Sequence, residues 1–349
     1  MKNMKAVVYK GDGIIRLEDR PIPDIQKDTD ALVKVTLTTI CSSDIHIKHG
    51  AVPRARKNII LGHEFVGEVV RVGHDVKKIR PADRVAVNVE TFCGKCYFCK
   101  RGYVNNCTDK YGGWALGCRI DGGQAEYVRI PFADNCLTKI PDSVSDEAAL
   151  FTGDLLSTGY WAAKMADIRL SDTVAVIGAG PAGIAVMKCV GLYNPSRIIG
   201  IDIDDSRLEL LRKNRIADVV LNPLRDDVEK VVRDMTEGRG ADSVLEVAGS
   251  KESFETAWRI ARPNAVVGVV AMYEEDQVLP LPSMYGKNLT FKTGGVDASN
   301  CEEILRLIEN GKLDTECMIT HRTTLDHIME AYQIFENKED GMIKCAVRV

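Results

Sequence analysis

The chain has 349 residues, of which 45% are hydrophobic and 28% are charged, and its formal net charge is −4. This composition excludes a largely disordered chain, and the length predicts about two domains. The nearly balanced charge argues against nucleic acid or a membrane surface as a partner. No apolar run reaches the length of a membrane span, and residues 4–9 are expected to form a strand rather than a secretory leader.

The first 150 residues are rich in short apolar runs and contain no long helical period. Gly, Pro and Asp turns separate these runs, as is typical of β-strands joined by tight connections. The expected strands span residues 4–9, 31–37, 65–72, 84–87 and 124–130. This part of the chain is therefore predicted to form a compact, mostly antiparallel β domain.

From about residue 157 the pattern changes to alternating helices and apolar strands. The expected strands span residues 173–177, 198–203, 219–221, 243–247, 266–272 and 289–293. The expected helices span residues 157–167, 183–192, 206–213, 227–236 and 251–261. Such alternation is typical of an α/β fold with a doubly wound parallel sheet. Two further helices, 299–309 and 325–337, and a strand, 342–349, are expected to follow.

Four cysteines lie close together at positions 93, 96, 99 and 107, in the pattern C-x2-C-x2-C-x7-C. Four thiolates at this spacing suit the tetrahedral all-sulfur shell of a structural zinc. The alternatives are disulfides, which such short spacings would strain, and buried apolar thiols, which a segment this polar does not favour. A closed site of four ligands leaves no position for a substrate, so this metal is not expected to catalyse a reaction.

The chain has eleven cysteines in all, and the other seven show no pairing pattern. Free thiols beside a metal site indicate a reducing compartment, so we expect a cytoplasmic protein.

A glycine-rich turn follows the strand expected at 173–177. Gly178, Gly180 and Gly183 form the pattern G-x-G-x-x-G between that strand and a helix. Taken alone the pattern is weak, but in this context it predicts a dinucleotide site. Gly178 makes the turn, Gly180 allows the backbone to approach a pyrophosphate, and Gly183 allows close packing of helix and strand.

Asp202 lies 19 residues after Gly183, at the end of the next strand. An acidic residue at this point binds the adenosine ribose hydroxyls and repels a 2′-phosphate, which favours NAD(H) over NADP(H). Arg207 is the one nearby residue that weakens this preference. The alternative is that Asp202 is an exposed acid at the start of a helix.

Cys41, His63 and Asp154 are candidate ligands for a second metal. One thiolate, one imidazole and one carboxylate suit the open three-ligand site of a catalytic zinc. Their wide separation in the chain does not select them over a buried thiol or an isolated histidine.

Several motifs together resemble the zinc-dependent medium-chain alcohol dehydrogenases. The run Gly62-His-Glu-Phe-Val-Gly-Glu-Val-Val-Arg-Val-Gly73 is similar to the zinc signature of that family. The segments around Cys41 and Asp121, the four-cysteine loop and the glycine turn follow in the family's order.

The resemblance implies a GroES-like β-barrel catalytic domain and a Rossmann domain. We expect the catalytic domain over 1–156 with the zinc loop at 93–107, the NAD-binding domain over 157–296, and a return to the catalytic domain over 297–349. Two zinc ions per chain are implied, one catalytic and one structural. Relatives associate through the edge strand, here 289–293, so a homodimer or homotetramer is implied.

The resemblance also assigns roles to single residues. Cys41, His63 and Asp154 match the catalytic zinc ligands, and Glu64 matches an acid that can approach the metal. Ser43 matches the hydroxyl that takes the alcohol proton, and His46 matches the end of the relay to solvent. Asp44 matches a residue that orients a metal ligand, and Lys344 matches a basic residue that contacts the pyrophosphate. Trp114 matches an aromatic residue that lines the substrate pocket, although a purely structural role explains it nearly as well.

Asp154 together with Ser157-Thr158-Gly159 resembles the bacterial secondary-alcohol branch, whereas the four-cysteine loop and Asp202 separate the chain from it. Glu90 and Asp297 are candidates for the pocket rim, where polar groups suit a diol or polyol. The expected activity is NAD-dependent oxidation of a secondary alcohol, diol or polyol to a ketone. The alternatives are dehydrogenation of L-threonine, a hydroxysteroid or a formaldehyde adduct, and a non-catalytic NAD-binding structural protein.

Overall fold

The computed structural model describes residues 2–349, and its contacts divide the chain into two compact units. Unit 1 comprises Met1–Ser157 and Val296–Val349, and unit 2 comprises Thr158–Gly295. Helix α4 (Leu155–Met165) carries the chain from the first unit into the second. Between residues 2 and 349 no helix is both long and apolar enough to span a membrane.

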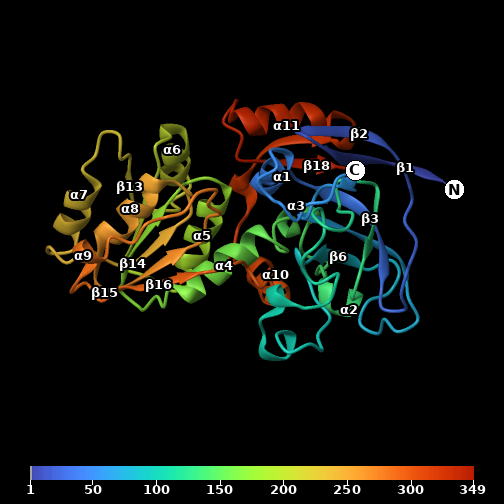
Figure 1. Ribbon diagram of the computed structural model, residues 1–349, viewed down its shortest axis with the longest axis horizontal. Coiled ribbons are helices and arrows are strands. Elements are labelled where there is room, and N and C mark those ends of the chain that lie inside the picture. The colour runs from blue at the N-terminus through green and yellow to red at the C-terminus, as the bar shows by residue number, and fades with distance from the viewer. Residues whose placement is uncertain (1) are drawn as a thin grey trace. The chain divides into compact units, whose positions relative to one another are not determined.

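The largest sheet of unit 1 has the strand order β10-β6-β5-β3-β18-β17, with β9 also paired to β3. Figure 1 labels β3, β6 and β18 of this sheet. All of these pairs are antiparallel except β17–β18. The strands are β3 (Ala31–Thr38), β5 (Phe65–Val72), β6 (Arg84–Val87), β9 (Tyr127–Ile130), β10 (Leu137–Lys139), β17 (Ile319–Thr324) and β18 (Lys344–Arg348). The C-terminal strands therefore complete a sheet that the N-terminal segment begins.

Two smaller sheets and several short helices complete unit 1. The sheets are β2-β1-β4, formed by β1 (Asn3–Gly11), β2 (Ile14–Pro21) and β4 (Ile59–Ile60), and the ladder of β7 (Glu90–Thr91) with β8 (Gly113–Trp114). The α-helices are α1 (Ser42–Lys48), α2 (Ala133–Cys136), α3 (Asp146–Ala149), α10 (Cys301–Glu309) and α11 (Ile328–Asn337). The 3-10 helices are η1 (Cys99–Arg101), η2 (Val104–Asn106), η3 (Glu316–Met318) and η4 (Leu325–His327).

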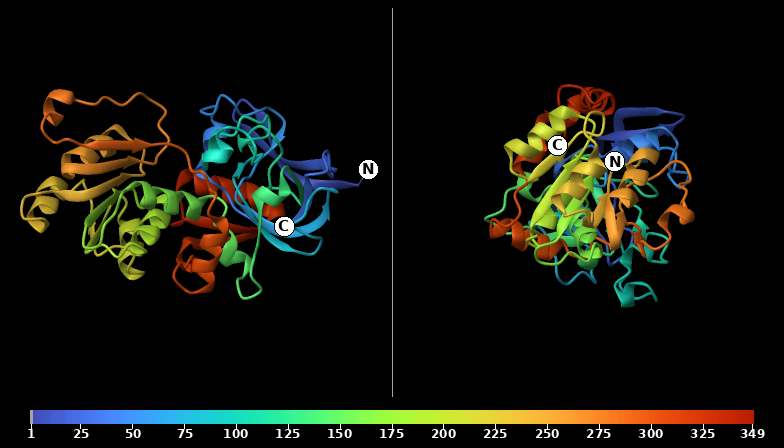
Figure 2. Two further views of the ribbon diagram at one scale, coloured as in Figure 1. Left: turned by 90° about the horizontal axis from the view of Figure 1, so that it is seen from below. Right: turned by 90° about the vertical axis from the view of Figure 1, so that its left-hand side faces the viewer.

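Unit 2 contains a parallel six-stranded sheet of order β13-β12-β11-β14-β15-β16. Its strands are β11 (Thr173–Ile177), β12 (Arg197–Ile201), β13 (Val219–Leu221), β14 (Ala241–Glu246), β15 (Ala261–Val269) and β16 (Thr290–Thr293). Its helices are α5 (Pro181–Gly191), α6 (Asp205–Lys213), α7 (Val228–Met235), α8 (Lys251–Ile260) and α9 (Leu281–Met284). Figure 2 shows the segment with α9 extending beyond the strands that precede and follow it.

Every residue of β11 is buried, as expected for a central strand of a parallel sheet that helices cover on both faces. Asp227 begins α7 by accepting a hydrogen bond from the Lys230 backbone N–H, which satisfies one of the donors left free in the first turn. The predicted α/β class and the doubly wound parallel sheet are confirmed.

Several boundaries differ from the predictions. Helix α8 ends at Ile260 and β15 begins directly at Ala261, whereas a helix to 261 and a strand from 266 were expected. The backbone of Ala261 is already extended, with φ −67° and ψ 134°. Pro263 keeps Arg262 extended as well, since proline disfavours helical backbone at the preceding residue. Helix α1, the hairpin strand β2 and strand β17 were not predicted.

Candidate metal and cofactor sites

The four-cysteine loop gathers its thiols at one point of unit 1. The sulfur atoms of Cys93, Cys96, Cys99 and Cys107 all lie within 4.8 Å of one another. Sulfur atoms bound to zinc at about 2.3 Å in a tetrahedron lie about 3.8 Å apart, so the four residues fit such an ion. All eleven cysteines carry free thiols, and the Cys96–Cys99 sulfur separation of 3.4 Å leaves the pair unbridged.

Local backbone shapes this loop. The short helices η1 and η2 turn the chain between Cys99 and Cys107, and Gly102 joins them with a left-handed φ of 84°. Hydrogen bonds from the backbone of Cys99 and Thr108 lower the pKa of the Cys96 thiol to about 5. The loop therefore favours at least one thiolate, the form that binds metal.

A second group of metal-binding side chains converges from three separate segments. Ligand atoms of Cys41, His63, Glu64 and Asp154 lie within 4.8 Å of one another. The His63 Nε2 atom is 3.3 Å from Asp154 Oδ2. One thiol, one imidazole and one carboxylate with a further acid at hand fit the donor set of a catalytic zinc.

Buried polar residues support this group from behind. Asp44 Oδ1 lies 3.5 Å from His63 Nδ1, and Asp44 Oδ2 accepts hydrogen bonds from the Cys41 backbone N–H and from Gln124 Nε2, each at 3.0 Å. The Tyr332 hydroxyl on α11 donates to Gln124 Oε1 at 2.7 Å. Burial lowers the pKa of His63, but Cys41, Asp154 and Asp44 together raise it above its ordinary value, so binding of a metal displaces a proton.

Glu64 forms a buried ion pair with Lys344. The Lys344 side chain is 1% exposed and its Nζ donates to Glu64 Oε1 at 2.7 Å and to the Ile40 carbonyl at 3.0 Å. Burial opposes the charge of Lys344, but Glu64 raises the pKa of the ammonium. This contact was not predicted, and the assignment of Lys344 to the pyrophosphate stays a prediction.

The expected relay residues Ser43 and His46 both lie on α1, one turn apart. Ser43 Oγ lies 3.6 Å from Cys41 Sγ, beside the second metal-binding group. His46 is half-buried in the last turn of α1, near the surface.

Trp114 and Glu90 face this group from the β7–β8 ladder. The Trp114 ring packs edge-on against the His63 ring with a centroid distance of 5.4 Å, and Glu90 is its direct partner across the ladder. Burial and the nearby Asp154 raise the pKa of Glu90 to about 8. Asp297 instead accepts hydrogen bonds from the backbone and hydroxyl of Ser299, at 3.1 Å each.

The glycine turn of unit 2 has the geometry that close backbone approach requires. Gly178 has a φ of 108°, and a Cβ atom on Gly183 would lie 1.8 Å from the Gly178 carbonyl oxygen, so neither position accepts a side chain without distortion. Gly180 begins α5, and Pro181 occupies its first turn. The open backbone N–H groups at this helix end suit the phosphates of a dinucleotide.

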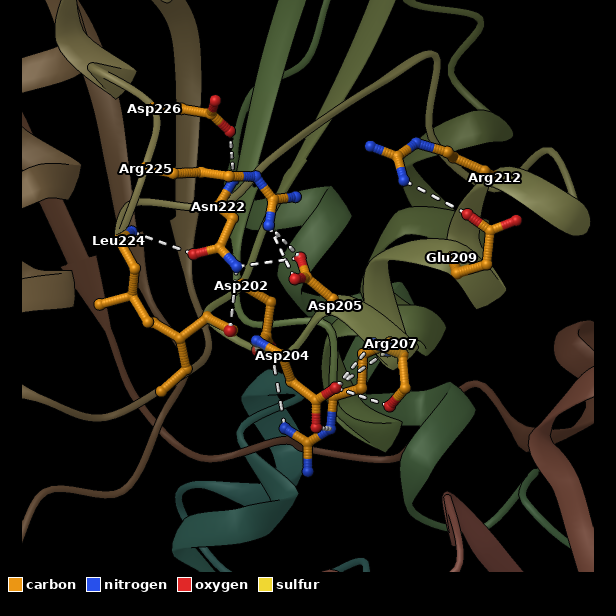
Figure 3. A network of polar contacts seen from close by, with 12 residues as sticks. Asp202, Asp204, Asp205, Arg207, Glu209, Arg212, Asn222, Leu224, Arg225 and Asp226 are labelled. Atoms are coloured by element: carbon orange, nitrogen blue, oxygen red, sulfur yellow. Dashed lines mark hydrogen bonds and ion pairs between the residues drawn. The ribbon is translucent and has the colours of Figure 1, made fainter.

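Asp202 follows β12 and bonds back to the glycine turn. Its Oδ2 accepts from the Ala179 backbone N–H at 2.6 Å, and its Oδ1 accepts from the Asp204 N–H at 2.9 Å. Figure 3 shows Arg207 reaching toward the same acids, with its Nη1 3.7 Å from Asp202 Oδ2. Asp205 pairs with Arg225 and Asn222 instead. Asp202 is therefore buried against the turn, not exposed at a helix start.

The sequence did not assign Gln124 or Tyr332 to the site, and it indicated Glu90 only as a candidate for the pocket rim. Gln124 carried a signal, because it lies within the Asp121–Tyr127 motif. Tyr332 carried none, since its contact spans 208 residues.

Two protein-family descriptions match the chain. Residues 27–142 match the alcohol dehydrogenase GroES-like domain, and residues 178–310 match the zinc-binding dehydrogenase domain. These matches cover more than half of the chain and confirm the predicted GroES-like and Rossmann-type combination.

Individual relatives cover nearly the whole chain. An alcohol dehydrogenase of Cupriavidus necator is 37% identical over 99% of this chain and 98% of its own length. An NADP-dependent isopropanol dehydrogenase of Thermoanaerobacter brockii is 31% identical over 91% and 92%. The structure of zinc dependent alcohol dehydrogenase 2 from Streptococcus pneumonia superimposes with a TM-score of 0.93 at 34% identity, covering 99% of this chain and 98% of that one.

Proposed function

Because the chain belongs to the zinc-type medium-chain alcohol dehydrogenase family, we propose that it reversibly oxidises a secondary alcohol, diol or polyol to a ketone, with NAD as hydride acceptor. The observation that carries the proposal is the convergence of Cys41, His63 and Asp154 within 4.8 Å. Relatives that are alcohol dehydrogenases support the reaction type, and the isopropanol dehydrogenase of Thermoanaerobacter brockii supports a secondary alcohol.

Cys41, His63 and Asp154 would hold the catalytic zinc. A zinc ion so held supplies a Lewis acid that lowers the pKa of the substrate hydroxyl. Asp44, held in turn by Gln124, keeps the His63 ring in place. Lys344 forms an ion pair with Glu64, and its positive charge compensates the Glu64 carboxylate beside the proposed zinc ligands.

Ser43 and His46 carry the proton in this proposal. Ser43 takes the proton of the alcohol hydroxyl, because its own hydroxyl lies beside Cys41. His46, half-buried one turn further along α1, exchanges that proton with solvent, a task suited to imidazole near neutral pH.

A nicotinamide cofactor bound at the glycine turn of unit 2 would supply the hydride acceptor for this oxidation. Gly178, Gly180 and Gly183 leave room for its pyrophosphate, and Asp202 binds the ribose hydroxyls. The negative charge of Asp202 supports NAD over NADP, although the Thermoanaerobacter brockii relative is NADP-dependent. Arg207 stays engaged with Asp202 and Asp204, which reduces its capacity to attract a 2′-phosphate.

Cys93, Cys96, Cys99 and Cys107 would hold a second, structural zinc. We place the protein in the cytoplasm because its cysteines are free, and we propose a homodimer or homotetramer. Strand β16 forms an edge of the six-stranded sheet, and its unpaired backbone groups suit association with another copy. Light scattering measures the assembly.

A panel of alcohols and ketones with NAD(H) and NADP(H), run beside a zinc determination, tests the function. We expect turnover of secondary alcohols with NAD and two zinc ions per chain. Turnover confined to L-threonine, a hydroxysteroid or a formaldehyde adduct would replace the substrate class. No turnover of any alcohol by the zinc-loaded protein would leave a non-catalytic NAD-binding protein.

A further inference from the structure

Glu90 presents a buried carboxylate oxygen without a partner. Its side chain is 7% exposed, and its Oε2 makes no hydrogen bond with any residue from 2 to 349. The backbone N–H of Glu90 donates to Asn88 Oδ1 at 2.8 Å, so the strand that carries it is held in place. A buried polar atom without a partner is costly, and a ligand that supplies one is correspondingly favoured.

Trp114 presents the complementary donor. It is 8% exposed, and its Nε1 likewise makes no hydrogen bond with the residues that the structure describes. Glu90 and Trp114 are direct partners across the β7–β8 ladder, so their side chains leave the same face with Cβ atoms about 5 Å apart. One acceptor and one donor are thus available side by side.

This pair lies next to the proposed metal ligands. The Trp114 ring meets the His63 ring at 5.4 Å and an interplanar angle of 68°. A substrate hydroxyl directed at a metal held by Cys41, His63 and Asp154 would therefore lie near Trp114, and the next carbon of the substrate could reach the Glu90–Trp114 pair.

The surrounding charges bear on what this part of the substrate carries. Arg54 lies over the Trp114 ring, with its Cζ 5.0 Å from the centroid. Glu90 Oε2 and Arg119 Nη2 both lie beside Gly113: a Cβ atom placed on this glycine would be 3.6 Å from the first and 3.7 Å from the second. The Arg119 guanidinium is therefore close to the Glu90 carboxylate. Glu90 and Asp154 oppose an anionic substrate there, while the two arginines balance them. A neutral group that both donates and accepts satisfies the pair best.

Resting on the proposed function, we infer that Glu90 and Trp114 together bind a second hydroxyl group of the substrate, which selects diols and polyols over simple secondary alcohols. A hydroxyl donates to or accepts from a carboxyl group in either protonation state, and it accepts from an indole N–H. Glu90 is thus a specificity-determining residue.

The test compares 2,3-butanediol with 2-butanol, which differ by one hydroxyl group. We expect Glu90→Met to lower the ratio of kcat/KM for the diol to kcat/KM for the monohydric alcohol by about tenfold or more. Glu90→Gln keeps both donor and acceptor and is expected to retain the ratio within about threefold. Both alcohols are measured on one sample, so a partly folded variant does not change the ratio.

Glu68→Gln on the exposed face of β5 is the matched control, and it should leave the ratio unchanged. Trp114→Phe keeps a ring against His63 but removes the donor, and it should also lower the ratio. An unchanged ratio in Glu90→Met overturns the inference. If the wild-type protein oxidises neither alcohol, the proposed function fails, and calorimetric binding of the two alcohols then decides. Tighter binding of the diol by the wild-type protein, lost in Glu90→Met, supports the inference. Equal affinities of the wild-type protein for the diol and the monohydric alcohol overturn it.

Discussion

At the scale of single residues, Cys41 and Asp154 have the most direct consequence for catalysis. Each would supply one of three donor atoms to the proposed catalytic zinc, so Cys41→Ala and Asp154→Ala are expected to lower kcat by at least about 100-fold. NADH binding should persist, because the glycine turn belongs to unit 2. Zinc analysis should find about one ion per chain in place of two. Full activity in either variant would contradict the assignment.

Asp202 sets the second prediction at this scale. Asp202→Ser removes the charge that opposes a 2′-phosphate and frees Arg207, so the ratio of kcat/KM for NADP to that for NAD should rise about tenfold or more. Steady-state kinetics with both cofactors measure the change. Glu209→Gln removes an exposed charge from the same helix, α6, and is the matched control. If the ratio of kcat/KM for NADP to that for NAD is the same in wild type and Asp202→Ser, Asp202 does not bind the adenosine ribose.

The sequence predicted those residues of the candidate site that lie within short recognisable motifs. Gly178 and Asp202 stand in a pattern whose spacing is tied to a local geometry, a turn and a strand end. Cys41 and His63 were indicated by the resemblance of the segments around them to family motifs and not by their spacing. The contact of Tyr332 with Gln124 depends on how distant elements pack, and the pairing of Glu90 with Trp114 depends on the β7–β8 ladder. No local pattern indicates that a tyrosine on α11 supports Gln124.

At the scale of elements, α1 and α11 are joined by one acidic side chain. Glu336 on α11 pairs with Lys48, and its Oε1 lies 2.6 Å from His49 Nε2. The Lys48 hydrogen bond, against the effect of burial, lowers the pKa of Glu336. Because the carboxylate is favoured in the folded state, its ionisation stabilises the fold fully at pH values above the ordinary pKa of the acid. This stabilisation is lost as the pH falls through the lower pKa of the folded state.

Glu336→Gln is therefore expected to lower the free energy of unfolding by about 1 kcal/mol at pH 7 and by much less at pH 3. Denaturant midpoints at the two pH values measure this difference. Added salt should reduce the effect at pH 7, since the pair is partly exposed. A loss of equal size at both pH values would show that packing, and not the charge, is responsible.

Strands with a clear run of apolar residues were predictable from the sequence. Strands that form only because they pair with another strand were not. The apolar strand β11 was predicted to the residue, because its run Thr-Val-Ala-Val-Ile ends at Gly178. Strand β17 has one apolar residue among six, and it becomes a strand by pairing with β18. Strand β15 contains an irregular register between its pairs with Ala241 and Ser243, so the apolar run 266–272 indicated only its second half.

At the scale of the whole molecule, the two groups of candidate metal ligands are proposed to have separate roles, one catalytic and one structural. Cys99→Ser should reduce zinc to about one ion per chain while the ion at Cys41 remains. Because the 93–107 loop has only short 3-10 turns of its own, it should become sensitive to proteases in that variant. Limited proteolysis and metal analysis check both points. Two zinc ions and an intact loop in Cys99→Ser would contradict the structural role.

The interrupted arrangement of unit 1 has a consequence for biosynthesis. Unit 2 and most of unit 1 are translated before residues 296–349, so the ribosome releases β18 only after the parallel sheet has had time to form. Until then β3 lacks its β18 partner, and Glu64 lacks the cation of Lys344. Lys344 is therefore translated about half of the chain after Asp154, the last of the four side chains that converge at this site. A nascent chain stalled before residue 344 would hold these side chains without the buried cation that pairs with Glu64.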